Sequence, residues 1–205
     1  MLIKLYEQNP SIKELKKVVE VLKNDGVIIY PTDSVYAFGC NIFSTKALER
    51  IARLKNLDPQ KAHFSLIFYD LSQISNYTNP LSNEIFKLLK RNLPGPFTFI
   101  LEANSKVPKM LKLNKKKTIG MRIPNNNIAR QIVYELGNPI FTTSVIEDDD
   151  IIEYMTDPEL IHEKYKDLVD LVIDGGTGSL TPSTIVDCTG SEIEVIRQGA
   201  GELLF

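Results

Sequence analysis

The chain has 205 residues, of which 43% are hydrophobic and 24% are charged, and this balance excludes intrinsic disorder. Its formal net charge of −2 excludes a global attraction to nucleic acid, so any such attraction must come from a local patch. No stretch contains the roughly 20 apolar residues that cross a bilayer, and Lys4 and Glu7 interrupt the N-terminal segment. We therefore expect a cytoplasmic globular protein without a signal peptide or a membrane partner.

Five helices are predicted, each from apolar residues that recur at helical spacing. The first begins with a capping box formed by Ser11 and Glu14. It is expected to stop at Asn24-Asp25-Gly26, with Gly26 in a left-handed conformation. The other four are expected to begin near Ser44, to span residues 82–91, to follow Pro124 and to begin at Thr156-Asp157-Pro158-Glu159.

Eight short runs rich in β-branched and aromatic residues predict strands between the helices. These runs are residues 27–31, 64–69, 97–102, 118–123, 139–144, 169–173, 183–187 and 193–197. Short strands interleaved with helices predict a mixed α/β sheet with helices on its faces. Because no long linker divides the chain, we predict one domain over residues 1–205.

Polar residues stand at the ends of several predicted strands, and two arginines lie within strands. The polar residues are Thr32, Asp33, Ser34, Thr142, Thr143, Ser144, Ser183 and Thr184. Arg122 and Arg197 have apolar neighbours, and arginine is seldom buried without a partner. Its planar fork suits a carboxylate or a phosphate. Two interpretations stay open: a ligand site, or a pairing of each arginine with a structural aspartate such as Asp187.

Basic residues near the end of the second helix offer a further candidate site. Lys55 and Lys61 are able to bracket a polyphosphate as mobile point charges, and the alternative is a solvated helix end. His63, just before a strand, is a candidate substrate contact. Neither GxxxxGK[ST] nor GxGxxG occurs, which excludes a P-loop or Rossmann nucleotide site.

No spacing in the sequence is typical of a metal site. Cys40 and Cys188 are expected to be buried thiols in a reducing compartment. The acidic run at residues 147–150 lacks the alternating ligand spacing of an EF-hand and is expected to be a solvated loop. We therefore predict no dedicated protein metal site.

Seven ordered blocks resemble the YrdC-type family of L-threonylcarbamoyladenylate synthases. The run from Tyr30 to Tyr36 is similar to the family signature PTDTxYGLG. The other blocks are Lys55 to Lys61, LPGPFTFIL (93–101), TIGMRIP (118–124), PIFTTS (139–144), STIVD (183–187) and IRQG (196–199). The resemblance covers nearly the whole chain and is strongest to the YciO branch. It implies a YrdC/RibB-like twisted mixed sheet with a central, positively lined cavity.

The resemblance also implies an activity. Enzymes of the family use ATP, bicarbonate and L-threonine to form threonylcarbamoyl-AMP and pyrophosphate, and a partner complex then transfers the threonylcarbamoyl group to tRNA. ATP would enter as a substrate with its own Mg²⁺, and no side-chain nucleophile is needed. By position, the threonine and bicarbonate side would be formed by Thr32, Ser34, Tyr36, Arg122 and Ser183. The nucleotide side would be formed by Lys55, Lys61, His63, Thr118, Ser144 and Arg197.

Three departures from the family pattern bear on activity. Leu57 replaces the arginine of the family's KxR motif, and Ile146 replaces the asparagine of its SAN triplet. The acidic run from Glu147 replaces the SG that usually follows. A missing bidentate phosphate contact costs about 1.5–3 kcal/mol for each charge-assisted bond. We therefore expect weak or altered synthase activity.

A function of another class is an RNA-binding module without efficient catalysis. Lys109, Lys112 and Lys115–Lys117 form a cationic cluster that would contact tRNA, double-stranded RNA or the ribosome. The alternative is an exposed turn leading into a strand. No aromatic residue interleaves with these lysines, which disfavours a surface that stacks single-stranded bases.

Overall fold

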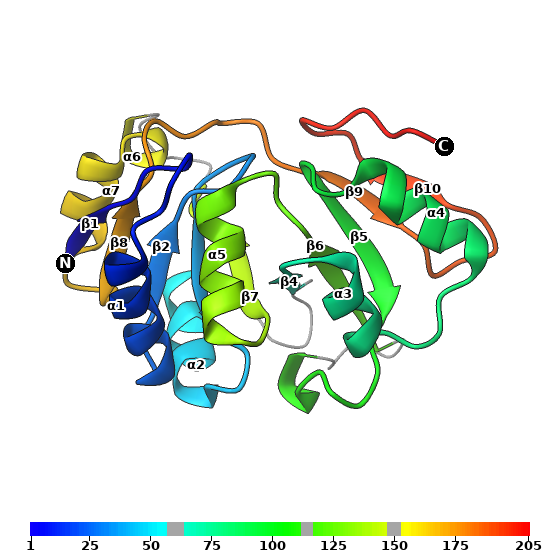
Figure 1. Cartoon of the computed structure of the whole chain (residues 1–205), viewed down its shortest axis with the longest axis horizontal. Coiled ribbons are helices and arrows are strands. Elements are labelled where there is room, and N and C mark those ends of the chain that lie inside the picture. Colours follow the sequence, from blue (N-terminus) through cyan, green and yellow to red (C-terminus); the bar gives the residue numbers. More distant parts are fainter. Residues whose placement is uncertain (57–63, 112–116, 147–152) are drawn as a thin grey trace.

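The structure, a computed structural model, describes residues 1–56, 64–111, 117–146 and 153–205. Within these residues, ten strands form one mixed sheet in the order β1-β8-β2-β3-β7-β4-β6-β5-β9-β10. The strands are β1 (Leu2–Lys4), β2 (Ile28–Tyr30), β3 (Ala37–Asn41), β4 (Ser65–Ile67), β5 (Phe97–Glu102), β6 (Thr118–Arg122), β7 (Ile140–Ser144), β8 (Leu171–Asp174), β9 (Thr184–Asp187) and β10 (Glu194–Arg197). β1 lies at one end of the sheet with the N-terminus, and β10 lies at the other (Figure 1).

The predicted mixed α/β sheet is confirmed, and the ends of all eight predicted strands differ from prediction by at most two residues. The sequence did not predict β1, which has three residues, or β3, whose sequence AFGCN contains no β-branched residue. β3 forms because it pairs antiparallel with β2 on one side and with β7 on the other. Its position inside the sheet thus overrides its weak local preference.

The five predicted helices are present, and the structure adds α3 and α6. The α-helices are α1 (Ile12–Lys23), α2 (Thr45–Leu54), α3 (Leu71–Tyr77), α4 (Asn83–Asn92), α5 (Asn127–Leu136), α6 (Glu153–Thr156) and α7 (Pro158–Tyr165). The predicted capping box is wrong, because Ser11 makes no side-chain cap bond and Glu14 pairs with Lys17 at 2.9 Å. The left-handed residue after α1 is Asp25 (φ 59°) rather than Gly26. A Cβ at Gly26 would instead clash with a valine of α1, so this glycine permits a close approach.

The core forms two clusters on opposite faces of the sheet, because successive side chains of a strand point in opposite directions. Ile28 and Tyr30 of β2 join the cluster that contains α1 and α5, whereas Ile29 between them joins the other cluster. We call the first side the α1/α5 face, and Figure 1 shows these two helices side by side. The second cluster includes residues of α2, α4 and α7.

The side chains on the α1/α5 face change from apolar to polar between β2 and β5. Ile140 of β7 packs in the apolar cluster, but the next positions of β7 on the same face are Thr142 and Ser144. The pattern continues with Ser65 of β4 and Thr98 of β5, which alternate with apolar residues of the opposite cluster. The polar half of this face is therefore available for ligand chemistry.

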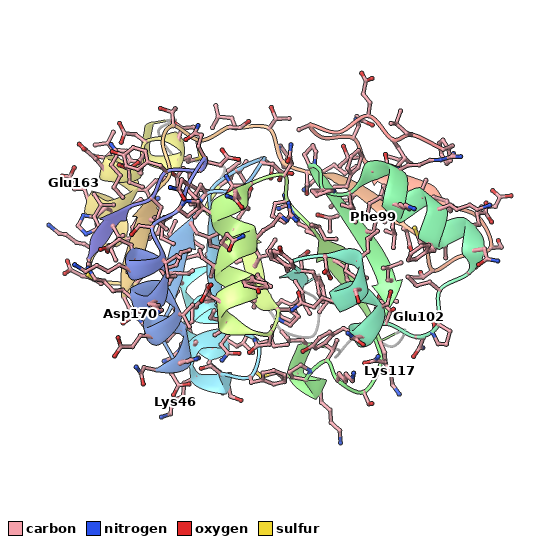
Figure 2. The ribbon with its side chains drawn as sticks, viewed as in Figure 1. Lys46, Phe99, Glu102, Lys117, Glu163 and Asp170 are labelled. Atoms are coloured by element: carbon pink, nitrogen blue, oxygen red, sulfur yellow. The ribbon has the colours of Figure 1, made fainter. Side chains whose placement is uncertain are left out.

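Exposed charged side chains mark the outer surface of the fold. Lys46, Lys117 and Glu163 are exposed and extend from its periphery (Figure 2). None of the described helices combines the length and the apolar character that a bilayer crossing requires.

Ser44 and Ser11 provide a matched test of helix capping. The Ser44 hydroxyl accepts from the Ala47 N–H at 3.1 Å and donates to Asp25 at 2.6 Å, whereas Ser11 makes no cap bond. We expect Ser44→Ala to lower the free energy of unfolding by about 1–2 kcal/mol and Ser11→Ala by less than about 0.5 kcal/mol. Urea titration of both variants measures the difference, and equal losses would contradict this account of the two caps.

Candidate functional site

A cavity of about 160 Å³ opens on the polar half of the α1/α5 face. Residues of β3, β4, β5, β6, β7, β9 and β10 contribute to its wall. Two arginines, Arg122 and Arg197, share it with a set of hydroxyl side chains. These hydroxyls include Ser34, Ser65, Thr98, Thr142, Ser144 and Ser183. The ends of strands that are far apart in the sequence thus meet in one polar, cationic hollow.

Strand register explains how the hollow is kept open. Ser65 pairs with Thr142 on one side and with Gly120 on the other. A Cβ at Gly120 would lie 2.5 Å from the Ser65 Oγ and 2.8 Å from the Thr98 Cγ2, so only glycine leaves this space free. A second cavity of about 60 Å³ shares Ser65 and Thr98 with the first and extends to Thr118. We call these two adjoining cavities, which share Ser65, Thr98 and Ile185, the trough.

Arg122 is the most buried charge of the trough, with a residue exposure of 6%. Its Nη2 donates to Asp33 Oδ1 at 3.0 Å and to Ser34 Oγ at 2.9 Å. The Nε–H of Arg122 is buried and has no hydrogen-bond partner among the described residues. Arg122 also lines the cavity, where an anionic ligand is able to accept from its guanidinium.

The carboxylate that pairs with Arg122 is Asp33, not Asp187 as the structural interpretation proposed. Asp33 Oδ2 also accepts the Asn125 N–H, at 2.7 Å, in the turn that leads into α5. Asp187 instead accepts the backbone N–H and the hydroxyl of Thr189, at 2.8 and 2.7 Å. The two interpretations of Arg122 therefore combine, since it has a structural partner and also lines a cavity.

Electrostatics in the trough favour an anion. Burial raises the pKa of Asp33 above its ordinary value of 3.8, and Arg122 and the Asn125 N–H offset part of this effect. Partial burial lowers the pKa of Arg197, and the positive charge of Arg122 lowers it further. The two guanidinium groups repel each other, and among the described residues one carboxylate, Asp33, pairs with them, so a net positive charge remains there for a ligand to neutralise.

Hydrogen bonds around Thr32 fix the polarity of Ser34. The Thr32 hydroxyl donates to the Val35 carbonyl at 2.8 Å, and its oxygen lies 3.1 Å from the Ser34 Oγ. Because the Thr32 proton is already used, the Ser34 hydroxyl donates to Thr32 and accepts from Arg122. Ser34 therefore presents an acceptor to the cavity, and Thr32 orients it from behind the wall.

The opposite wall of the cavity is built on Ser183. Its hydroxyl lies 2.8 Å from the Thr98 hydroxyl, and its carbonyl accepts from the Arg197 Nη2 at 2.8 Å. Ser144 lies across the sheet in β7, where it pairs with Ala37 of β3. The structure thus brings Ser34, Arg122, Ser144, Ser183 and Arg197 to one cavity, as the sequence predicts, while their ligand contacts stay a prediction.

Other residues predicted for the site lie elsewhere. Tyr36 is fully buried, donates to the Gly176 carbonyl at 2.7 Å and does not line the cavity. Lys55 donates to the Ile146 carbonyl at 2.9 Å, which ties the end of α2 to the segment after β7. Lys61 and His63 lie outside the described residues, as does Leu57, so their roles stay predictions.

Sequence reasoning assigned no ligand role to Asp33, Ser65, Thr98 or Thr142. The sequence contains a recognisable pattern for three of these residues. Ser65, Thr98 and Thr142 occupy polar positions inside predicted strands whose alternate residues are apolar. Asp33 lay in the quoted signature, but its pairing with an arginine 89 residues away requires the fold.

The described part of the chain gives no evidence for a metal site or for a reactive thiol. No three His, Cys, Asp or Glu side chains gather there as metal ligands, and the acidic run at 147–150 lies outside it. Cys40 and Cys188 are buried, as predicted. Burial raises the pKa of both thiols, that of Cys188 to about 12, so neither is a ready nucleophile.

Comparison with known proteins identifies the family to which this chain belongs. Residues 20–199 match the family Sua5_yciO_yrdC, described as "Telomere recombination". The chain belongs to this family. The predicted resemblance to YrdC-type proteins and to the YciO branch is thereby confirmed.

Individual relatives place the chain within the family. It is 40% identical over 200 residues to the uncharacterized protein YciO of Escherichia coli strain K12, covering 97% of this chain and 95% of YciO. The crystal structure of E. coli YciO has a TM-score of 0.91 at 39% identity, over 98% of this chain and 97% of YciO. A threonylcarbamoyl-AMP synthase of Neisseria gonorrhoeae is 33% identical over 129 residues, covering 63% of this chain and 68% of the synthase.

A more distant structure shares the fold. The crystal structure of Sua5 from P. abyssi, complexed with L-threonine, has a TM-score of 0.85 at 21% identity. The match covers 97% of this chain and 57% of the Sua5 chain. At this identity the likeness shows the fold alone.

The pKa of Asp33 predicts a pH dependence of stability. Because the folded pKa lies above the unfolded value of about 3.8, the folded state holds the Asp33 proton more tightly. This contribution to the free energy of unfolding is complete below the unfolded pKa and is lost as pH rises through the folded pKa. We expect wild type to lose stability relative to Asp33→Asn as the pH rises from about 4 through the folded pKa of Asp33. Urea titrations across this range test the sign, and a difference that grows in favour of wild type would contradict it.

Proposed function

We propose that this protein is a threonylcarbamoyl-AMP synthase-like enzyme that takes ATP, L-threonine and bicarbonate and releases pyrophosphate. The observation that carries the proposal is that Arg122 and Arg197 line one polar cavity together with several hydroxyl side chains. Two cationic groups of this kind suit a carboxylate at one end of the trough and phosphate at the other. The name of the N. gonorrhoeae relative supports the same reaction class.

The Arg122 end of the trough suits an amino acid. A carboxylate would accept from Arg122, and an amine would donate to Ser34, whose oxygen is held as an acceptor. The cavity of about 160 Å³ is below the roughly 300–1,000 Å³ typical of drug-sized ligands, so it suits a compact molecule such as an amino acid, and a nucleotide would extend beyond it. The fold relative Sua5 was crystallised with L-threonine, which supports this amino acid as the ligand.

The other end of the trough suits a nucleotide. Arg197 offers a positive charge for phosphate oxygens, and Ser144, which is predicted for the same side, offers a hydroxyl. The adjoining cavity is lined in part by Ile100 and Ile185, which lie on the same face as Thr98 and offer apolar surface to a base. Mg²⁺ would enter with ATP as part of the substrate.

The reaction then depends on positioning and positive charge. The threonine amine and bicarbonate combine with loss of water to an N-carboxylate, and an oxygen of that carboxylate attacks the α-phosphorus of ATP. The bond from the α-phosphorus to the bridging oxygen breaks, and pyrophosphate leaves with the electron pair. Arg197 would stabilise the charge that develops on the departing group. Transfer to tRNA by a downstream partner complex would follow outside this site.

Two local features support a slower or altered enzyme. Ile146 has no polar group in its side chain, and its backbone carbonyl accepts from Lys55. The resemblance assigned Lys55 to phosphate, and this bond would compete with that role. The RNA-binding alternative stays a prediction, since Lys112, Lys115 and Lys116 of its lysine cluster lie outside the described residues.

Pyrophosphate release tests the proposed reaction directly. We expect release from ATP that depends on both L-threonine and bicarbonate, because the attacking group forms only from the two together. Arg197→Ala is expected to reduce the rate about tenfold or more through loss of one charge-assisted contact. Release should be measured at high enzyme concentration, with each substrate omitted in turn.

Arg91→Ala is the matched control for Arg197→Ala. Arg91 is an exposed arginine of α4 that does not line the trough, so its loss should leave the rate unchanged. Absence of release, or release that is indifferent to threonine or bicarbonate, would contradict the proposed function. RNA binding with a steep salt dependence and no ATP binding would favour the alternative.

A further inference from the structure

Tyr30 lies behind the cavity wall and does not line it. Its side chain is fully buried at the end of β2, on the same face of the sheet as the cavity. The Tyr30 hydroxyl hydrogen-bonds to the Thr142 Oγ1 in β7 at 2.7 Å. In the sheet order β3 separates β2 from β7, so the phenol ring crosses an intervening strand to reach its partner.

Gly39 makes this crossing possible. It lies in β3 directly opposite Thr142, while Tyr30 is opposite Ala37. A Cβ at Gly39 would lie 2.7 Å from the Tyr30 Cε1, which is too close for any larger residue without a shift of the ring. Because Gly39 has no side chain, the Tyr30 ring is able to pass over β3 at this position.

The hydrogen bond between these residues has a preferred direction. If Thr142 donated to Tyr30, the phenol proton would be buried with no other partner among the described residues, at a cost of about 1–3 kcal/mol. If Tyr30 donates, the proton of Thr142 is left for a group in the cavity that Thr142 lines. Burial raises the pKa of Tyr30 above its ordinary value, so the phenol keeps its proton. The phenol is therefore the donor.

We propose that Tyr30 is a positioning residue that makes the Thr142 hydroxyl a directed hydrogen-bond donor to a carboxylate or carbamate oxygen of the ligand. This inference rests on the proposed amino-acid site. The cavity then offers an acceptor at Ser34 and donors at Arg122 and Thr142. A ligand with an amine and an oxyanion on adjacent atoms matches this distribution, whereas a neutral alcohol does not.

A set of variants tests whether Tyr30 acts through Thr142. The probe is L-threonine, titrated calorimetrically into the whole chain. We expect Tyr30→Phe to weaken binding about two- to tenfold, the worth of one hydrogen bond, and Thr142→Val to weaken it at least as much. The double variant should bind no more weakly than Thr142→Val alone, because the tyrosine has then nothing to orient. In a Thr142→Ser background, which keeps the hydroxyl, Tyr30→Phe should retain its effect.

Tyr165→Phe is the matched control, since it removes a buried phenol hydroxyl from the opposite cluster. There the ring centroids of Tyr165 and Phe38 lie 5.1 Å apart. This variant should leave the affinity unchanged. Unchanged affinity in folded Tyr30→Phe, or additive losses in the double variant, would overturn the inference and leave the proposed function intact.

Two further outcomes also decide whether the inference about Tyr30 holds. If Tyr30→Phe fails to fold, unchanged affinity in Thr142→Val overturns the inference alone. If wild type itself does not bind L-threonine, the proposed amino-acid site fails, and the inference falls with it.

Discussion

The ion pair between Arg122 and Asp33 is the constraint on which the rest of the site depends. An arginine that is only 6% exposed needs a carboxylate partner, because removing one partner of a buried pair costs about 3–5 kcal/mol. The pair joins the loop after β2 to the end of β6, and Asp33 also accepts an N–H from the turn before α5. Asp33 does not line the cavity, so this contact holds Arg122 from outside the cavity that Arg122 lines. One pair of residues thus holds the fold together at this point and positions a charge for the ligand.

Two glycines shape the space around this pair. Gly120 keeps the trough open between Ser65 and Thr98, and Gly39 lets Tyr30 pass over β3 to reach Thr142. Each is a strand residue, where glycine is locally unfavourable and the absence of a Cβ is used for close approach. Near them, the hydroxyls of Thr32 and Tyr30 each donate to one defined acceptor, and the hydroxyls of Thr98 and Ser183 bond to each other. A cavity arranged in this way selects a ligand by the order of its donors and acceptors as much as by its charge.

Much of the fold could be predicted from sequence because strong local patterns matched the tertiary environment. The run 97–102 became β5 with the same bounds, since its alternating aromatic residues fit a buried strand face. β3 was missed because its neighbours, not its own residues, make it a strand. The cavity residues Arg122 and Arg197 were found from their unusual apolar surroundings. The roles of Asp33 and Tyr30 could not be predicted, because each depends on a hydrogen bond to a residue that is distant in sequence and is brought near only by the folded sheet.

The most direct test of this account compares two ligands on the unmodified protein. L-threonine and L-threoninol share the amine, the side-chain hydroxyl and nearly the same volume, but L-threoninol has no carboxylate. If the Arg122 guanidinium receives the ligand's carboxylate, calorimetry will show binding of L-threonine and at least about tenfold weaker binding of L-threoninol. Equal affinity for the two compounds would contradict the central role given to Arg122.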